Sequence, residues 1–136
     1  MPFVLDASVA MSWCFADEIT PFSDHVLESL RDTYATVRPL WSFEVLNAVA
    51  MSERRGRLTA PLSDEFIETL SALDIRVDQD FPKAAQGDLL LLVRRHGLTS
   101  YDAAYLQLAK RRNLPLATLD RKLLAAASQE GVALFS

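Results

Sequence analysis

The sequence predicts an α/β fold in which helices cover both faces of a mainly parallel sheet. Short apolar runs of strand type alternate with longer segments of helical type, and this alternation is typical of such folds. The apolar run 3–5 leads directly into Asp6, and the run 114–119 leads into Asp120. Uninterrupted apolar strands indicate a sheet that is buried on both sides. With this length and an even composition, we expect one domain over residues 1–136.

Start and stop signals delimit the individual elements. Thr20 followed by Pro21 is typical of a helix start, with an N-cap residue and then proline at the first helical position. Gly56 and Gly97 each follow a helix-like segment, where a left-handed residue commonly ends a helix. In chain order we expect strand 3–5, helix 9–15, helix 21–30, strand 35–38, helix 40–55, helix 63–73, strand 75–77, helix 81–96, helix 100–113, strand 114–120, helix 121–128 and strand 132–135.

The longest of these helices carries two overlapping patterns. Phe43, Leu46 and Val49 recur at helical spacing and predict a buried face. Glu44 and Asn47 lie three residues apart and therefore share a neighbouring face. A carboxylate among apolar neighbours is costly if it is buried without a partner. An exposed glutamate near a helix start is equally compatible with this segment.

The charge and the single cysteine limit the classes of function. The net charge of −4 argues against binding of nucleic acid through a broad basic surface. It leaves room for an enzyme that acts on nucleic acid through bound metal, because the cations invert the local charge. Basic residues gather at 54–57, 94–96, 110–112 and 121–122, mostly where they also complement helix ends. Cys14 cannot form an internal disulfide, and no segment resembles a signal peptide or a membrane span, so we expect a cytoplasmic protein without membrane contact.

Four acidic residues occupy comparable places in the predicted elements. Asp6 and Asp120 end apolar strands, whereas Glu44 and Asp102 stand in the first turns of helices. Each one taken alone has a structural explanation, because such carboxylates cap helices or accept free backbone N–H groups. Ligands of open α/β sheets, however, bind in the crevice outside the carboxyl ends of the strands. The two strand-end acids would meet in that crevice if their strands are neighbours.

Four carboxylates in one place would repel one another. A pair of like charges at about 4 Å costs on the order of 4 kcal/mol at an effective dielectric constant of about 20. The cluster must therefore take up protons or bind cations. Oxygen ligands without histidine or cysteine suit Mg²⁺ or Mn²⁺ better than zinc, and Mg²⁺ completes its shell with water and substrate phosphate. These four acids thus favour phosphoryl chemistry, whereas Asp78, Asp80 and Asp88 fit no such pattern and are expected to be solvated.

Four short segments carry a family resemblance. They are VLDAS at 4–8, EVLN at 44–47, TSYDAAYL at 99–106 and TLD at 118–120. In this order they resemble the motifs of PIN-domain ribonucleases, in particular the VapC-type toxins of bacterial toxin–antitoxin pairs, and the resemblance extends over residues 3–135. It implies a three-layer α/β/α sandwich with a mainly parallel sheet of four or five strands. It also implies a metal-dependent endoribonuclease, usually a homodimer, that a cognate antitoxin holds inactive.

The same resemblance assigns roles to seven residues. The four acids would be catalytic and would bind one or two Mg²⁺ or Mn²⁺ ions. The hydroxyls of Ser8 and Thr118 would line this site, and Asn47 would help to hold Glu44 or a bound water. Metal chemistry then predicts hydrolysis of RNA phosphodiester bonds by a water whose pKa the metal lowers. A basic antitoxin side chain, best an arginine, could enter the acidic pocket.

Other classes of function remain open at this point. A receiver-type signalling module also has a Mg²⁺-binding acidic pocket, but it needs paired acids after the first strand and a lysine after a late strand. Here one acid, Asp6, follows the first strand, and Lys122 lies beyond Asp120. A catalytically silent PIN-like module for protein interaction would show all four motifs. A DNase would share the carboxylates, and His25 and His96 lie outside the motifs, which disfavours a histidine ribonuclease.

Overall fold

A parallel four-stranded sheet forms the centre of the protein, with the strand order β3-β2-β1-β4. The computed structural model describes residues 1–136. All three neighbouring pairs of strands are parallel, because helices connect the strands and return the chain to the same edge. The predicted α/β fold with a parallel sheet is confirmed. Its strands are β1 (Phe3–Leu5), β2 (Ala35–Val37), β3 (Ile75–Val77) and β4 (Leu116–Ala117).

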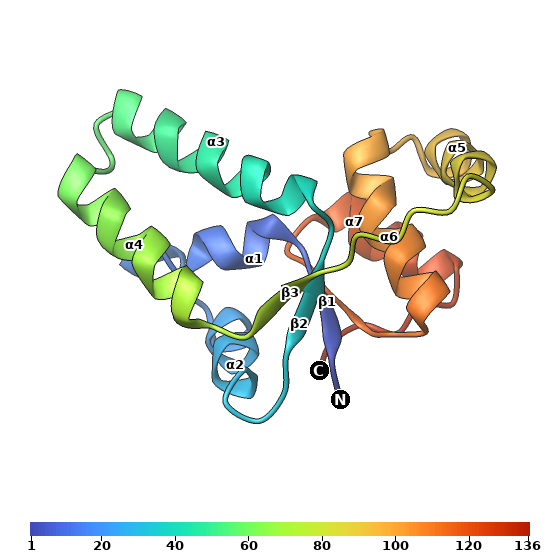
Figure 1. Ribbon diagram of the computed structural model, residues 1–136, viewed down its shortest axis with the longest axis horizontal. Coiled ribbons are helices and arrows are strands. Elements are labelled where there is room, and N and C mark those ends of the chain that lie inside the picture. Colours follow the sequence, from blue (N-terminus) through green and yellow to red (C-terminus); the bar gives the residue numbers. More distant parts are fainter.

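Helices flank the sheet on two sides (Figure 1). The first group packs around α1, and a short 3-10 turn, Ala16–Glu18, leads from α1 to α2. The second group packs around α6, which also contacts β1 and β4. No helix combines the length and the hydropathy that a membrane span requires. The first group comprises α1 (Ala7–Ser12), α2 (Pro21–Ser29), α3 (Leu40–Arg54) and α4 (Ala60–Ala72), and the second comprises α5 (Ala85–His96), α6 (Ser100–Arg112) and α7 (Arg121–Gln129).

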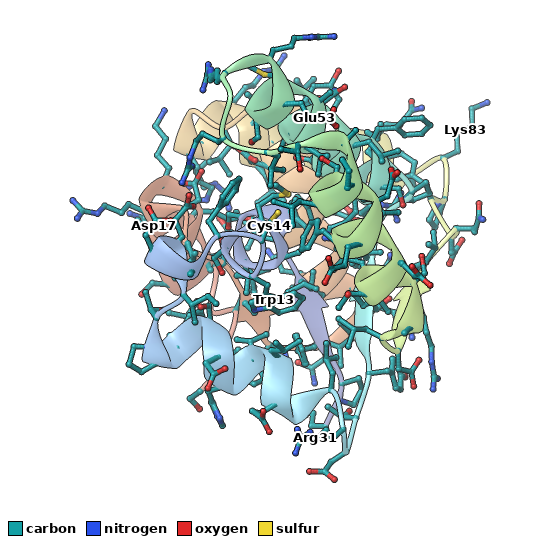
Figure 2. The ribbon with its side chains drawn as sticks, turned by 90° about the vertical axis from the view of Figure 1, so that its left-hand side faces the viewer. Trp13, Cys14, Asp17, Arg31, Glu53 and Lys83 are labelled. Atoms are coloured by element: carbon teal, nitrogen blue, oxygen red, sulfur yellow. The ribbon has the colours of Figure 1, made fainter.

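The core is centred on β1 and α6. All three residues of β1 are fully buried, which explains why this strand has no polar alternation. Small residues such as Ala103 let α6 approach the sheet closely, and Leu106 is fully buried. On the other side of the sheet Trp13 lies in the interior of the helical layer (Figure 2), where its indole N–H donates to the carbonyl of Ser23 at 2.8 Å. β1 is therefore buried within the core, and its carboxyl end leads directly into Asp6.

Several predicted boundaries differ from those observed. The fourth helix begins at Ala60 rather than at 63, because Thr59 caps it by accepting the Leu62 N–H at 3.4 Å. The fifth helix begins at Ala85 rather than at 81. The strand predicted at 132–135 is reduced to a single bridge between Leu134 and β4.

The predicted buried face of α3 is wrong at two positions. Phe43 is 63% exposed and Leu46 is 48% exposed. The residues that α3 buries are instead Trp41, Val45 and Val49, spaced four residues apart. This rotation of the helix leaves a line of apolar side chains in contact with solvent.

The prediction that Asp78 is solvated is also wrong. Asp78 follows β3, and its side chain is only 3% exposed. It accepts hydrogen bonds from Arg111 at 3.1 Å and Arg112 at 3.0 Å, both at the end of α6, and from the backbone N–H of Asp80 at 2.8 Å. Burial alone would raise the pKa of Asp78, but these hydrogen bonds and positive charges hold it below its usual value.

Candidate functional site

The carboxyl ends of β1 and β4 place two of the predicted residues side by side. Leu5 pairs with Ala117 in the parallel register, and the Asp6 N–H donates to the carbonyl of Ala117 at 3.0 Å. Thr118 follows β4 directly, and its hydroxyl donates to Asp6 Oδ2 at 2.6 Å. Residues 112 positions apart therefore meet at the edge of the sheet where such folds bind ligands.

A second hydroxyl completes the support of Asp6. Ser8 donates to the same carboxylate oxygen, Oδ2, at 2.8 Å, and it accepts the Leu119 N–H at 3.1 Å. Thr118 in turn accepts the Asp120 N–H at 3.0 Å. The two hydroxyls thus join the ends of β1 and β4 and fix the orientation of Asp6. Both hydroxyls donate to Oδ2 of Asp6, so neither of them occupies the second carboxylate oxygen, Oδ1.

Asp102 and Asp120 approach Asp6 from the starts of two helices. Asp120 is the N-cap of α7 and accepts the Leu123 N–H at 3.1 Å. Asp102 lies in the first turn of α6, where its own N–H donates to the N-cap Thr99 at 3.1 Å. Asp120 therefore caps α7, as its position suggests. At α6 the capping residue is Thr99, and Asp102 is not the cap. Helix capping and membership of the acidic cluster coexist at these positions.

Glu44 joins the cluster from α3 through a tyrosine. The phenol of Tyr105 on α6 donates to Glu44 Oε1 at 2.5 Å. Burial, this hydrogen bond and the nearby carboxylate charges all raise the pKa of Tyr105, so it stays a neutral donor. Tyr105 was not among the predicted site residues. Its position three residues after Asp102, hence on a neighbouring part of the same helix face, could have indicated it.

The charges of the four acids act on one another. Burial is the largest cause that raises the pKa of Asp6, and the charge of Asp120 adds to it against the hydrogen bonds from Thr118 and Ser8. Burial also raises the pKa of Glu44 and that of Asp102, and the charge of Asp6 contributes to both shifts. No lysine or arginine forms an ion pair with any of the four. The cluster therefore carries negative charge that no ion pair neutralises, although the charge of Lys122 acts on Asp102 against the larger effects of burial and the other acids.

Asn47 differs from the other predicted site residues. It lies on α3 one turn after Glu44, but it is exposed and makes no hydrogen bond to that residue. Tyr105 holds Glu44 instead. The structure therefore brings together the four acids and both hydroxyls and leaves Asn47 at the rim.

The donor atoms of the cluster fit a hydrated divalent ion. No three histidine, cysteine, aspartate or glutamate side chains are arranged to hold one metal ion directly. Mg²⁺ rarely requires such a cage, because it keeps several waters and uses one or two carboxylates together with substrate phosphate. An oxygen-only donor set that contains the buried, uncompensated Asp6 suits this mode of binding.

A large cavity lies elsewhere. It measures about 1030 Å³ and borders the amino ends of the strands, near Thr33 and Pro115. Figure 1 shows both chain termini at this end of the sheet, away from the start of α3. None of the four clustered acids lines this cavity. The chemistry of the side chains, rather than cavity size, therefore identifies the candidate site.

Comparison with known proteins agrees with the fold and the motifs. The PIN domain profile matches residues 3–129. The chain belongs to the PIN domain family. This finding confirms the resemblance seen in the four sequence motifs. The matched segment begins at β1 and ends with α7, so it contains all six residues that meet at the sheet edge.

Individual relatives of this PIN domain are distant. It is 29% identical over 127 residues to ribonuclease VapC3 of Pyrobaculum aerophilum, an alignment that covers 90% of this chain and 92% of the relative. The crystal structure of PAE2754 from the same organism has a TM-score of 0.71 at 27% identity and covers 93% of this chain and 79% of that one. VapBC2 of Rickettsia felis, solved with a promoter DNA fragment, has a TM-score of 0.70 at 14% identity, covering 99% and 98% of the chains. The last likeness concerns the fold alone.

Proposed function

We propose that this PIN domain is a metal-dependent endoribonuclease and the toxin of a type II toxin–antitoxin system. The observation that carries the proposal is the cluster of Asp6, Glu44, Asp102 and Asp120, whose charges act on one another and which form no ion pair with a lysine or arginine. Membership of the PIN family and the distant likeness to a ribonuclease support the same reaction class. The substrate is RNA, and its phosphate would approach the carboxyl ends of β1 and β4.

Each side chain has a distinct task in this proposal. Asp6 provides the central carboxylate, and Ser8 and Thr118 keep it in one orientation through their hydrogen bonds to Oδ2. Tyr105 fixes Glu44, so this carboxylate enters the cluster already ordered. Residues held in place before the substrate binds lose little entropy during the reaction.

Asp120 and Asp102 are positioned by the starts of α7 and α6. Because the helix dipole favours negative charge at these ends, the fold offsets part of the repulsion within the cluster. A bound Mg²⁺ or Mn²⁺, one ion or two, would supply the positive charge that polarises the phosphate and lowers the pKa of the attacking water. The four acids would hold it.

The proposed partner is an antitoxin, and two surfaces support this. The acidic crevice would attract a basic side chain, for which arginine has the best geometry. The exposed Leu46 of α3 lines an apolar groove of about 310 Å³ between α3 and α4, together with Trp41 and Ile67, and Phe43 is a further exposed apolar side chain of α3. Exposed apolar side chains in a group mark protein interaction sites. Homodimer formation and a cytoplasmic location remain part of the proposal.

A cleavage assay with one matched pair of variants tests the proposal. Structured and single-stranded RNAs are incubated with the purified protein in Mg²⁺ or Mn²⁺, and then with a chelator. We expect cleavage to require metal, to yield ends that carry a 5′-phosphate, and to fall more than about 100-fold in Asp6→Asn. Substitution of a residue that only orients a metal ligand typically lowers metal affinity or activity roughly 10–100-fold.

Asp64→Asn is the control, because Asp64 is an exposed acid on α4. It should cut RNA like the parent protein. Cleavage that is equal in Asp6→Asn and the parent, or that survives the chelator, would contradict the proposal. A folded protein that cuts no RNA under any metal condition would favour a silent interaction module.

A further inference from the structure

A second pocket lies beside the acidic cluster and shares one of its carboxylates. It has a volume of about 310 Å³ and lies between the segment after β2, the loop before α5, and the first turns of α6. Glu44 and Tyr105 line it, so its wall continues into the candidate site. Its volume falls at the lower end of the roughly 300–1,000 Å³ of small-molecule sites. We call it the Tyr101 pocket, after Tyr101 at its rim.

We propose that the Tyr101 pocket binds one unpaired nucleotide of the substrate RNA, next to the bond that is cut. The inference rests on the proposed ribonuclease function, and it adds a place where the enzyme would contact a base rather than the phosphate chain. The three features that support it are an available aromatic ring, a single fixed cation and continuity with the acidic cluster.

The aromatic ring belongs to Tyr101, which lies in the first turn of α6. Its side chain is among the exposed large apolar groups, with 57% of its surface accessible, although it borders a pocket. No other aromatic ring stacks on it. An aromatic face of this kind can stack on any base that has left the helical stack, because every base has a π-face. Tyr101 therefore suits an unpaired nucleotide and is poorly placed to read a duplex.

The cation is Arg38, directly after β2. It is the only lysine, arginine or histidine that lines the Tyr101 pocket. Its Nη1 donates to the backbone carbonyl of Asp80 at 2.9 Å, and its guanidinium lies 4.9 Å from the ring centroid of Phe81. These two contacts hold the guanidinium in the wall of the pocket. A fixed guanidinium is well suited to a phosphate oxygen.

The charges argue for a nucleotide rather than for a second protein chain. Protein interfaces are depleted of acidic residues, but this pocket has the Glu44 carboxylate in its wall, together with the Arg38 guanidinium. A nucleotide is compatible with both charged residues of the pocket, since its phosphate would face Arg38 and the scissile bond would lie towards Glu44. The apolar walls between them, formed in part by Leu40 and Leu89, would contact the base.

The test separates contacts to the base from contacts to the backbone. In an Asp6→Asn background, which prevents cleavage, we measure the affinity of a short fluorescent single-stranded RNA. A matched oligomer of the same length lacks all bases. Tyr101→Ala should weaken binding of the intact RNA roughly tenfold and leave that of the abasic oligomer unchanged, because a stacking contact is lost. Tyr101→Phe keeps the ring and should bind like the parent.

Arg38→Gln gives a second, independent readout. Loss of one phosphate contact lowers the slope of log affinity against log salt by about 0.7 for a single strand. We expect this change with both oligomers, because both keep their phosphates. Tyr34→Ala is the matched control: Tyr34 precedes β2 at the opposite end of the strand, and its ring lies 3.6 Å from the Arg76 guanidinium. It should change neither quantity.

The inference is overturned if Tyr101→Ala weakens the binding of both oligomers equally or changes the binding of neither. It is overturned as well if the parent protein binds no RNA at all. It is also overturned if Tyr101→Ala converts a dimer to a monomer in sedimentation, because a second copy of the chain would then cover the pocket. The proposed function fails separately, when the protein with intact Asp6 cuts no RNA in Mg²⁺ or Mn²⁺. In that case the affinities for the two oligomers and their salt dependence still test the Tyr101 pocket.

Discussion

Asp6 and Asp78 occupy the same kind of place in the fold, yet their surroundings are opposite. Asp6 follows β1 and Asp78 follows β3, and they are 5% and 7% exposed. The Asp6 carboxylate accepts two hydroxyl donors and lies near other acids, and its pKa is raised. The Asp78 carboxylate accepts hydrogen bonds from two arginines, and its pKa is lowered.

The difference shows what each carboxylate contributes. A buried charge is tolerated when an opposite charge and hydrogen bonds compensate it, and it is costly otherwise. At Asp78 the chain supplies its own arginines, and this site fastens the loop after β3 to the end of α6. At Asp6 the chain supplies uncharged hydrogen-bond donors and no positive charge. The missing positive charge would have to come from outside the chain, so Asp6 points to function and Asp78 to stability.

The largest expected effect compares the matched substitutions Asp6→Asn and Asp78→Asn. We expect Asp78→Asn to lower the free energy of unfolding by about 2 kcal/mol, because two arginines lose their partner. Breaking a fully buried pair costs about 3–5 kcal/mol, but Arg111 and Arg112 are 21% and 43% exposed and can turn to water. Asp6→Asn should leave stability unchanged or raise it, because it removes an uncompensated buried charge.

Urea unfolding at neutral pH measures both variants against the parent protein. The comparison is decided by which of the two variants loses more free energy of unfolding. If Asp6→Asn loses as much stability as Asp78→Asn, the hydroxyls of Ser8 and Thr118 would already compensate Asp6, and the argument for an external cation would fail.

A smaller effect is expected from the support of Glu44. Tyr105→Phe removes the phenol that donates to Glu44 Oε1 at 2.5 Å and keeps the ring in the core. Glu44 then loses its fixed orientation, and we expect kcat for RNA cleavage to fall roughly tenfold, as for other outer partners of a metal site. KM should change less than kcat, because the phenol donates its hydrogen bond to Glu44, and the ring by which Tyr105 lines the Tyr101 pocket is kept in phenylalanine.

Tyr34→Phe is the control for loss of a phenol outside the site, and it should keep the parent kcat. A fall in thermal stability alone, with kcat unchanged, would assign Tyr105 a structural role only.

Much of the fold follows from local patterns in the sequence. The strands at β1, β2 and β3 and the start of α2 at Pro21 agree with their predictions. The apolar run of β1, the β-branched residues of β2 and β3, and the Thr-Pro start signal are local features of the sequence. The face of α3 could not be predicted in this way. Phe43, Leu46 and Val49 have helical spacing, but so do Trp41, Val45 and Val49, and only tertiary packing decides between the two faces.

The candidate site was predictable to a similar extent. Asp6 and Asp120 end apolar runs, and the order of strands brings them to neighbouring places. The hydrogen bond from Tyr105 to Glu44 joins residues 61 positions apart, and no local signal specifies such a pair. Asp78 was mistaken for a solvated acid because its partners, Arg111 and Arg112, belong to a distant helix.

The smallest expected effect concerns pH and extends the comparison to Glu130, at the end of α7. Its side chain is 5% exposed and accepts hydrogen bonds at 2.7 Å from Lys110, His96 and Arg95. These donors lower the pKa of Glu130 to about 2, from an ordinary value of 4.5. Because the folded pKa is below the unfolded one, the stabilisation is complete above pH 4.5 and is lost as the pH falls to about 2.

Glu130→Gln should therefore lower the free energy of unfolding by about 1 kcal/mol near neutral pH, within the range of a charge-assisted hydrogen bond. The gap to the parent protein should close as the pH falls through the same interval, which urea unfolding at a series of pH values measures. Glu28→Gln is the control, because Glu28 and Arg31 form an exposed pair that contributes little. A gap that persists at the acid end would mean that Glu130 acts through packing, and the contrast between compensated and uncompensated carboxylates would then lose its second example.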